Sequence, residues 1–423
     1  MTNETHLKKF TPYQVLVIVL LGLTQFTVIL DFMIMSPLGD MLMKSMDLKT
    51  SQFGLAVSSY AFSAGISGLL TAGFADRFDR KKLLMFFYIG FIVGTFFCSI
   101  ATSYPSLIIA RIITGLFGGV IGSISMAIVA DLFPIEKRGR VMGFMQMSFG
   151  ASQVLGLPIG LFIANHWGWQ SPFLMIVILA SIVWLVVLIK MKPVTAHLKV
   201  QKDHSPLIHL WHTISKRDYR IGFLATAMLS LGGFMMMPWG SAFAINNLKI
   251  TQQQLPMLFM VSGVSSLVIM PLIGRLSDKI DKFKVFAIAS AWMIIMVLIY
   301  TNLTPVPLGY VMLMNVFFMI GIMSRMVPSS ALVSALPKMQ DRGAFMSISS
   351  SLQQISGGIA AGVGGLIVYQ KDKHSPLEHY NILGLVIVVL SLICVFMVYR
   401  VSRMIKAQAK EKAKVEVPQM AEV

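Results

Sequence analysis

The sequence predicts an all-α polytopic membrane protein whose twelve transmembrane helices form two pseudo-symmetric six-helix bundles. Three observations support this prediction. Of the 423 residues, 56% are hydrophobic and 13% are charged, with a mean hydropathy of +0.75, which is too apolar for a soluble chain of this length. Twelve apolar runs are long enough to cross a bilayer. Two short charged loops also recur in equivalent places, which indicates an internal repeat.

The first half contains six apolar runs that reach the length of about 20 residues needed to span a bilayer. They cover residues 13–36, 52–75, 83–103, 105–130, 141–163 and 172–190. The first run follows Lys8 and Lys9, as the apolar core of a signal peptide would. It is too long for that role and ends between Asp31 and Pro37 without a small-residue cleavage site, so we interpret it as a span.

The second half contains six further runs, at residues 219–245, 253–274, 283–302, 307–334, 345–369 and 380–402. We expect bundles at 13–190 and 219–402, a cytoplasmic linker at 191–218, and cytoplasmic ends at 1–12 and 403–423. In the linker, the positions i, i+3, i+4 and i+7 are apolar: Leu207, Leu210, Trp211 and Ile214. This spacing is typical of a short helix lying on the inner leaflet, and a plain polar loop is the alternative.

Two pairs of matching loops indicate a duplication. Loops 72–82 and 274–282 each follow the second span of their half and carry the order small residue, acid, base, acid, base, with Asp76 and Asp278 at equivalent positions. Loops 134–140 and 337–343 repeat at almost the same interval. Such repeats build two equivalent bundles, an architecture found in solute transporters whose substrate site lies between the halves.

The net charge of +17 does not indicate nucleic-acid binding, because the bases alternate with spans and form no single basic domain. With the N-terminus in the cytoplasm, 28 of the 35 Lys and Arg residues fall in inward segments. Such asymmetry across short loops is the positive-inside signal, so we expect both termini to be cytoplasmic.

The ionisable Asp, Glu, Lys and Arg residues inside the spans are Asp31, Arg111 and Arg325. Each costs about 2.5–3.5 kcal/mol on insertion scales, so each should be paired or face a water-filled cavity. Asp31 and Arg111 lie at matching depths, roughly 9 Å below the outer surface, and should meet. The pair is either a static salt bridge or a switch whose separation loads a proton.

Arg325 lies roughly 13 Å deep, and the spans of its own half contain no acid. Three roles are open for Arg325: it pairs with Asp31, it donates hydrogen bonds to backbone carbonyls, or it binds an anionic group of a substrate. Polar or soft residues inside spans are further candidates for a cavity wall. With Arg325, the predicted cavity set is Gln25, Gln146, Gln153, Met235, Trp239, Asn315, Gln353 and Gln354.

The charged loops place acids and bases beside neighbouring helix ends. This arrangement favours an inner gate in which Asp76 and Asp278 cap or bridge the helix ends, and a role as topology determinants alone is the alternative. The predicted gate residues are Asp76, Arg77, Arg80, Asp131, Arg138, Asp278, Lys279 and Arg342.

These motifs resemble the major facilitator superfamily over nearly the whole chain, most closely its twelve-span, proton-coupled drug, sugar or metabolite efflux branch. The family's loop pattern Gly-x-Leu-Ala-Asp-Arg-x-Gly-Arg-Lys is similar to residues 72–81, with Ala72 and Asp79 in place of the glycines. Its span-four pattern fits Arg111, but Leu157 interrupts its Gly-Pro antiporter pattern. The resemblance implies a rocker-switch cycle and links Arg111 to proton transfer.

We therefore expect a secondary active transporter that exports a small organic solute by proton antiport from a bacterial inner membrane. The alternative is a proton-linked importer or facilitative uniporter of a small solute that can be anionic. Besides the solute, the expected partners are protons and membrane lipids. We expect the protein to be a monomer and to need no cofactor or metal. An enzyme is not indicated, because the sequence has no metal-ligand cluster, phosphate-cradling loop or nucleophile elbow.

Overall fold

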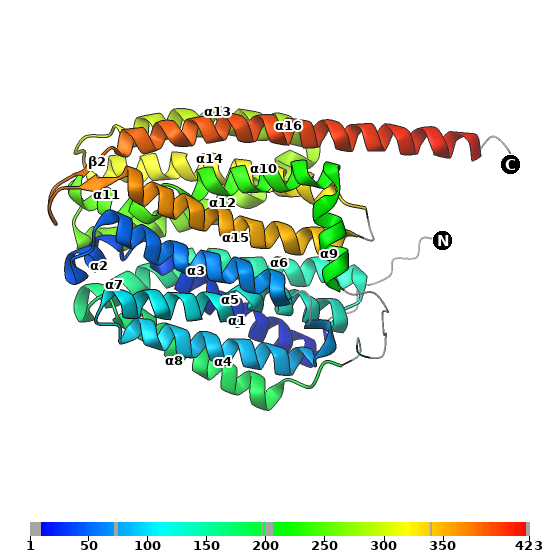
Figure 1. Cartoon of the computed structure of the whole chain (residues 1–423), viewed down its shortest axis with the longest axis horizontal. Helices are drawn as coiled ribbons and strands as arrows, with labels where there is room; N and C mark the ends of the chain where they lie inside the picture. The colour runs from blue at the N-terminus through cyan, green and yellow to red at the C-terminus, as the bar shows by residue number, and fades with distance from the viewer. Residues whose placement is uncertain (1–9, 72–74, 196–197, 199–205, 339–340, 420–423) are drawn as a thin grey trace.

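The computed structural model describes residues 10–71, 75–195, 198, 206–338 and 341–419, and long helices running in one direction dominate it (Figure 1). The long helices of the first half are α1 (Pro12–Ile34), α3 (Thr50–Thr71), α4 (Arg80–Ser99), α5 (Tyr104–Leu132), α6 (Ile135–Ala151), α7 (Leu157–Trp167) and α8 (Ser171–Lys190). Shorter pieces join them: α2 (Gly39–Met46), η1 (Ala75–Arg77) and the π-helical turn η2 (Ser152–Gly156).

The second half repeats this plan. Its helices are α10 (Arg217–Phe234), η4 (Met237–Trp239), α11 (Gly240–Asn246), η5 (Gln252–Gln254), α12 (Leu255–Lys279), α13 (Lys282–Thr301), α14 (Leu308–Ala335), α15 (Arg342–Ile367) and α16 (Tyr380–Gln419). Helix α9 (Pro206–Ser215) lies between the halves, and β1 (Tyr369–Gln370) pairs antiparallel with β2 (Leu377–Glu378).

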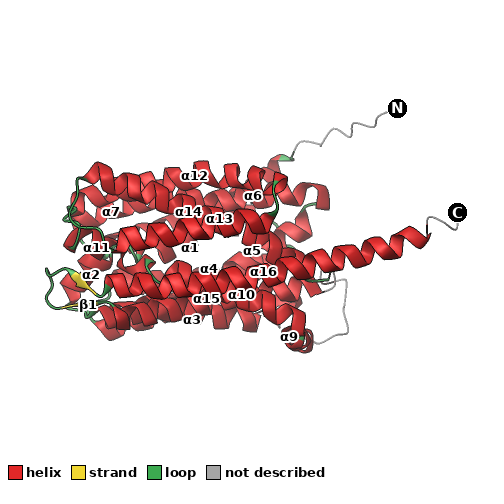
Figure 2. Cartoon of the chain, turned by 90° about the horizontal axis from the view of Figure 1, so that it is seen from above, coloured by secondary structure: helices red, strands yellow, loops and turns green. Residues whose placement is uncertain are grey.

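The two ends of the molecule differ. We call the end that carries α9, the start of α1 and the far end of α16 the basic end, because Arg80, Arg138 and Arg342 also lie there. The distal end carries α2, α11 and the β1–β2 hairpin (Figure 1). Helix α16 continues past the other helices at the basic end, and α9 lies at this end too (Figure 2).

The prediction of twelve helical spans is confirmed, because every predicted run falls on one helix or on helices joined end to end. In the described part of the chain, eleven helices are long and apolar enough to cross a membrane. Helix α15 is the twelfth predicted span. Its mean hydropathy is lower than that of the other eleven because it carries polar residues such as Ser347, Ser350, Gln353 and Gln354.

Two predicted spans are broken where proline occurs. The run 141–163 becomes α6, η2 and α7, and Pro158 follows the π-helical turn because its ring cannot fit against the carbonyl four residues earlier in a regular helix. The run 219–245 stops being α-helical near Met235 and resumes at Gly240, with Pro238 between. Residues beyond these breaks therefore face directions that a continuous helix would not give them.

The second acid of each repeated loop caps a helix. Asp79 is the N-cap of α4 and accepts from the Lys81 amide at 2.8 Å, and Asp281 is the N-cap of α13 and accepts from the Lys284 amide at 3.1 Å. A carboxylate at this position satisfies a free backbone donor and favours the positive helix end. The expectation that Asp278 caps a helix end is therefore wrong, since the cap lies one turn later.

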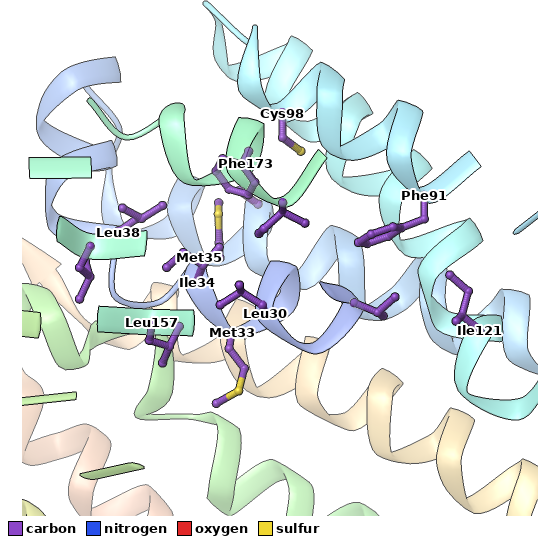
Figure 3. Packing of buried hydrophobic residues seen from close by; sticks show 14 of the residues in the cluster. Leu30, Met33, Ile34, Met35, Leu38, Phe91, Cys98, Ile121, Leu157 and Phe173 are labelled. Atoms are coloured by element: carbon purple, nitrogen blue, oxygen red, sulfur yellow. The ribbon is translucent and has the colours of Figure 1, made fainter. Parts of the chain in front are cut away.

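The first bundle is built around α1. Leu30 and Ile34 are buried against Leu157 of α7 and Phe173 of α8 (Figure 3). At Gly156 an added Cβ would lie 2.6 Å from Leu30 Cδ1, so a side chain there would hold α7 away from α1. Apolar packing of this kind fixes the backbone on which the polar residues of α1 are carried.

Candidate functional site

The two bundles are joined tightly at the distal end. Helices α3 and α15 pack so closely that hydroxyl groups of α3 bond the backbone of the α15 segment. Ser58 Oγ donates to Gly358 O at 2.7 Å, and Thr50 Oγ1 donates to Val368 O at 2.7 Å. A Cβ on Gly54 would lie 2.8 Å from Ala361 O. These helices belong to different bundles, so this contact closes one side of the space between them.

A polar cluster completes the closure between α2 and α11. Asp40, which is 1% exposed, accepts from Asn246 Nδ2 at 2.6 Å and pairs with Lys44 at 2.9 Å. Ser241 Oγ donates to Ser36 O at 2.8 Å, so equivalent segments of the two halves meet here. We call the α3–α15 contact and this cluster the distal seal.

A large cavity lies between the bundles on the other side of the seal. It has a volume of about 1120 Å³ and extends from Phe32 to Arg80 and Gly343 at the basic end. Its walls come from α1, α3 and α5 of the first bundle and from α10, α14 and α15 of the second. The molecule therefore holds a chamber that reaches one end while the other end is closed.

Three of the predicted cavity residues line this chamber: Gln25, Gln353 and Gln354. The side chain of Gln146 lies outside the described residues. The predictions for Gln153, Met235, Trp239 and Asn315 are wrong, because none of them is among the lining residues. Trp239 instead packs edge-on against Phe53 in the seal, and Asn315 bonds the Val311 carbonyl within its own helix.

Hydroxyl groups form much of the cavity wall, which the sequence analysis did not foresee. The lining serines and threonines beyond the predicted set are Thr71, Ser123, Thr226, Ser230, Ser329, Ser330, Ser334, Ser347, Ser349 and Ser350. For α15 the sequence spacing could have indicated this polar wall, since Ser347, Ser350 and Gln354 fall on one helical face. Arg80 is the charged member of the described lining, and it pairs with Asp131 at 3.3 Å.

Asp31 and Arg111 meet inside the first bundle, as their depths predict. Arg111 Nη1 donates to Asp31 Oδ2 at 2.9 Å, and the two side chains are 1% and 0% exposed respectively. Thr95 Oγ1 of α4 donates to Asp31 Oδ1 at 3.2 Å, and the guanidinium lies 4.5 Å from the ring centroid of Tyr60. Arg111 Nε has no hydrogen-bond partner among the described residues, so the pair is held by one hydrogen bond rather than by a two-point clamp.

Arg325 is 4% exposed and does not line the cavity. Its Nη1 donates to Ser391 Oγ at 3.3 Å, and its guanidinium lies 5.6 Å from the Phe286 ring centroid, so it points toward α13 and α16. Its assignment to the cavity wall is therefore wrong, as is the possibility that it reaches Asp31, which pairs with Arg111. The rotation of α14 about its axis directs Arg325 into the second bundle.

Replacing Arg325 with methionine should raise the thermal unfolding temperature. Its Nε and Nη2 have no partner among the described residues, and each buried, unsatisfied donor costs about 1–3 kcal/mol. An apolar side chain of similar length removes that cost. The matched control is Arg111→Met, which leaves the buried carboxylate of Asp31 without its basic partner and should lower the unfolding temperature. A lower unfolding temperature for Arg325→Met would mean that this base stabilises the fold.

The gate residues act within their own bundles in this state. Arg80 pairs with Asp131, while Arg138 Nη2 donates to Ala130 O at 2.6 Å near the end of α5. Arg342 Nη2 donates to Ser334 O at 3.3 Å near the end of α14, which is the equivalent contact in the second half. The remaining described gate residues, Arg77, Asp278 and Lys279, are exposed, and the side chain of Asp76 lies outside the described residues.

A family model described as Major Facilitator Superfamily matches residues 21–361 and 223–419. The chain is 24% identical over 350 residues to "Uncharacterized MFS-type transporter YceJ" of Bacillus subtilis, covering 81% of this chain and 87% of that protein. It is also 24% identical to "Probable sugar efflux transporter" of Mannheimia succiniciproducens, over 55% of this chain and 57% of that protein. A crystal structure of a bacterial homolog of the human lysosomal transporter Spinster matches with a TM-score of 0.74 and 16% identity, covering 94% of this chain and 99% of that one.

Proposed function

Because the chain belongs to the Major Facilitator Superfamily and is a transporter rather than an enzyme, we propose that it exports a small organic solute in exchange for protons. The observation that carries the proposal is the buried Asp31–Arg111 pair beside the cavity. A proton bound by Asp31 removes its charge and leaves Arg111 without its acid. The two protonation states therefore favour different arrangements of α1 and α5.

The loose geometry of the pair supports a switch over a static bridge. A structural ion pair buried to this degree gains most from two parallel hydrogen bonds and full satisfaction of its donors. Here a single bond joins the two groups, and Arg111 Nε lacks a described partner. Separation of the groups breaks a single hydrogen bond between them, and a proton on Asp31 removes the charge that attracts Arg111.

Alternating access accounts for the asymmetry between the two ends. We assign the basic end to the cytoplasm of a bacterial inner membrane, as positive charge on inward loops favours, so the cavity faces inward and the distal seal closes the outer side. In the opposite state the seal separates, and the gate residues at the basic end come together across the bundles. We propose that this cycle operates in a monomer held by membrane lipids.

The cavity wall favours a neutral solute rich in hydrogen-bonding groups. Gln25, Gln353 and Gln354 and several lining serines have side chains without partners among the described residues, which leaves them available to a solute. No described lining residue is an acid, which disfavours a cationic solute, and the lining base Arg80 is already paired. The alternative is import or facilitated diffusion through the same cavity, driven by the solute gradient.

The test combines a binding screen with flux measurements. A thermal-shift screen of the purified protein against sugars, anionic metabolites and lipophilic cations should select neutral polyhydroxylated compounds. In everted membrane vesicles, an imposed acidic interior should drive uptake of the selected compound, and collapse of the pH gradient should stop it. Uptake that follows the solute gradient alone would support the facilitative alternative instead.

A further inference from the structure

We infer that Tyr60, together with Phe32, forms an aromatic partition between the solute cavity and the Asp31–Arg111 pair. The inference rests on the proposed function for its role in coupling, but the partition itself is a property of the structure. Its consequence is that the solute binds in the cavity while the proton binds at the ion pair in the packed interior of the first bundle, with the ring of Tyr60 between the two sites.

The solute has no direct access to the ion pair in this state. Asp31 and Arg111 are essentially unexposed, and neither is among the residues that line the cavity. A transporter in which solute and proton compete for one carboxylate would place that carboxylate in the cavity wall. A direct influence of the solute on the pair must therefore pass through a side chain that touches both the cavity and the pair.

Tyr60 touches both. Its ring lines the cavity on one side, and on the other its centroid lies 4.5 Å from the guanidinium carbon of Arg111. Phe32, the neighbour of Asp31 in the chain, also lines the cavity, and its ring centroid lies 5.5 Å from that of Tyr60. Arg111 makes one hydrogen bond to Asp31, and the aromatic face of Tyr60 is a further contact that holds the guanidinium in place.

Tyr60 also sits where motion between the bundles would move it. On one side α3 contacts the second bundle through Ser58, which bonds Gly358 O. On the other it lies against α5, where a Cβ on Gly115 would be 2.4 Å from Tyr60 O. When the bundles rock, force from α15 therefore reaches α3 beside Tyr60, which packs on α5 one turn from Arg111. A solute pressing on the cavity face of the ring would act on the same contact.

Cys98 supplies a native reporter of the partition. It is 0% exposed, lies beside Arg111 and is 3.8 Å from Thr114 Oγ1, so it belongs to the packed interior around the ion pair. Cys394 is the other cysteine of the chain, so Cys394→Ala leaves a single thiol. The rate at which methyl methanethiosulfonate modifies Cys98 in the purified protein, followed by mass spectrometry, then measures access to the surroundings of the ion pair.

In this background Tyr60→Ala should raise the modification rate of Cys98 at least tenfold, and Tyr60→Phe, which keeps the ring, should leave it at the starting rate. Tyr88→Ala is the matched control, because Tyr88 is a buried ring of the same bundle that does not line the cavity. Equal acceleration by Tyr60→Ala and Tyr88→Ala, or none by Tyr60→Ala, overturns the partition. The measurement needs neither solute nor a pH gradient, so it stands or falls separately from proton antiport.

Discussion

Replacing Asp31 with asparagine should abolish the stimulation of transport by a pH gradient while leaving solute affinity unchanged. Asparagine keeps an oxygen that accepts from Arg111 and Thr95 but cannot bind the transported proton. Solute affinity should persist because Asp31 does not line the cavity. Flux into everted vesicles with and without an imposed gradient, beside equilibrium binding, measures both properties.

Asp47→Asn is the matched control for this experiment. Asp47 is an acid at the distal end whose side chain is 81% exposed and pairs with Lys373 at 3.0 Å, so its neutralisation should leave gradient-driven flux unchanged. If Asp31→Asn retains full gradient-driven transport, the proton switch at this pair is excluded.

Unfolding experiments separate the switch from a static bridge. Arg111→Met leaves the Asp31 carboxylate buried without its base, and breaking a buried pair in this way costs about 3–5 kcal/mol of stability. Adding Asp31→Asn removes the stranded charge and should restore most of the loss. If the double variant regained gradient-driven transport along with stability, the pair would have only a structural role.

The sequence predicts depth within the membrane better than it predicts direction. The Asp31–Arg111 contact was predictable because the span ends and the helical rise fix how deep each residue lies. For Arg325 the sequence predicts a depth on its span, but no periodicity in an apolar helix fixes its rotation, and its side chain points toward Ser391 rather than the cavity. The prediction that Trp239 lines the cavity was wrong for a related reason, since the helix break before Pro238 directs its side chain into the distal seal.

The serines that line the cavity show a second limit of prediction from sequence. A charged residue inside a span is conspicuous because it is costly, whereas serine is inexpensive in a helix and can bond its own backbone, as Ser334 does with Ala331 O. A free hydroxyl such as that of Ser347 cannot be told from a self-bonded one before the neighbouring helices are placed. The low hydropathy of α15 was the available clue, because the first half of that helix lines the cavity.

Replacing Gly54 with leucine should hold the distal seal open. A Cβ at this position would lie 2.8 Å from Ala361 O and 3.3 Å from Gly365 Cα, both of which are backbone atoms of the other bundle that cannot turn aside. Overpacking of this kind costs about 1–3 kcal/mol and acts only on the state in which α3 and α15 touch. The equilibrium between the two states should therefore shift by roughly 5- to 150-fold toward the state open at the distal end.

The shift can be read from a thiol placed in the seal. Ala242 is fully buried in α11, so Ala242→Cys in a Cys98→Ala/Cys394→Ala background should react slowly with a maleimide and much faster when Gly54→Leu is added. Gly309→Leu is the control, because it lies at the distal end and a Cβ there meets no atom within 4 Å. Accelerated labelling together with arrested transport would identify the α3–α15 contact as the closure that must form in every cycle. Slow labelling with wild-type transport would mean that the bundles tolerate the wedge and close through the Asp40 cluster alone.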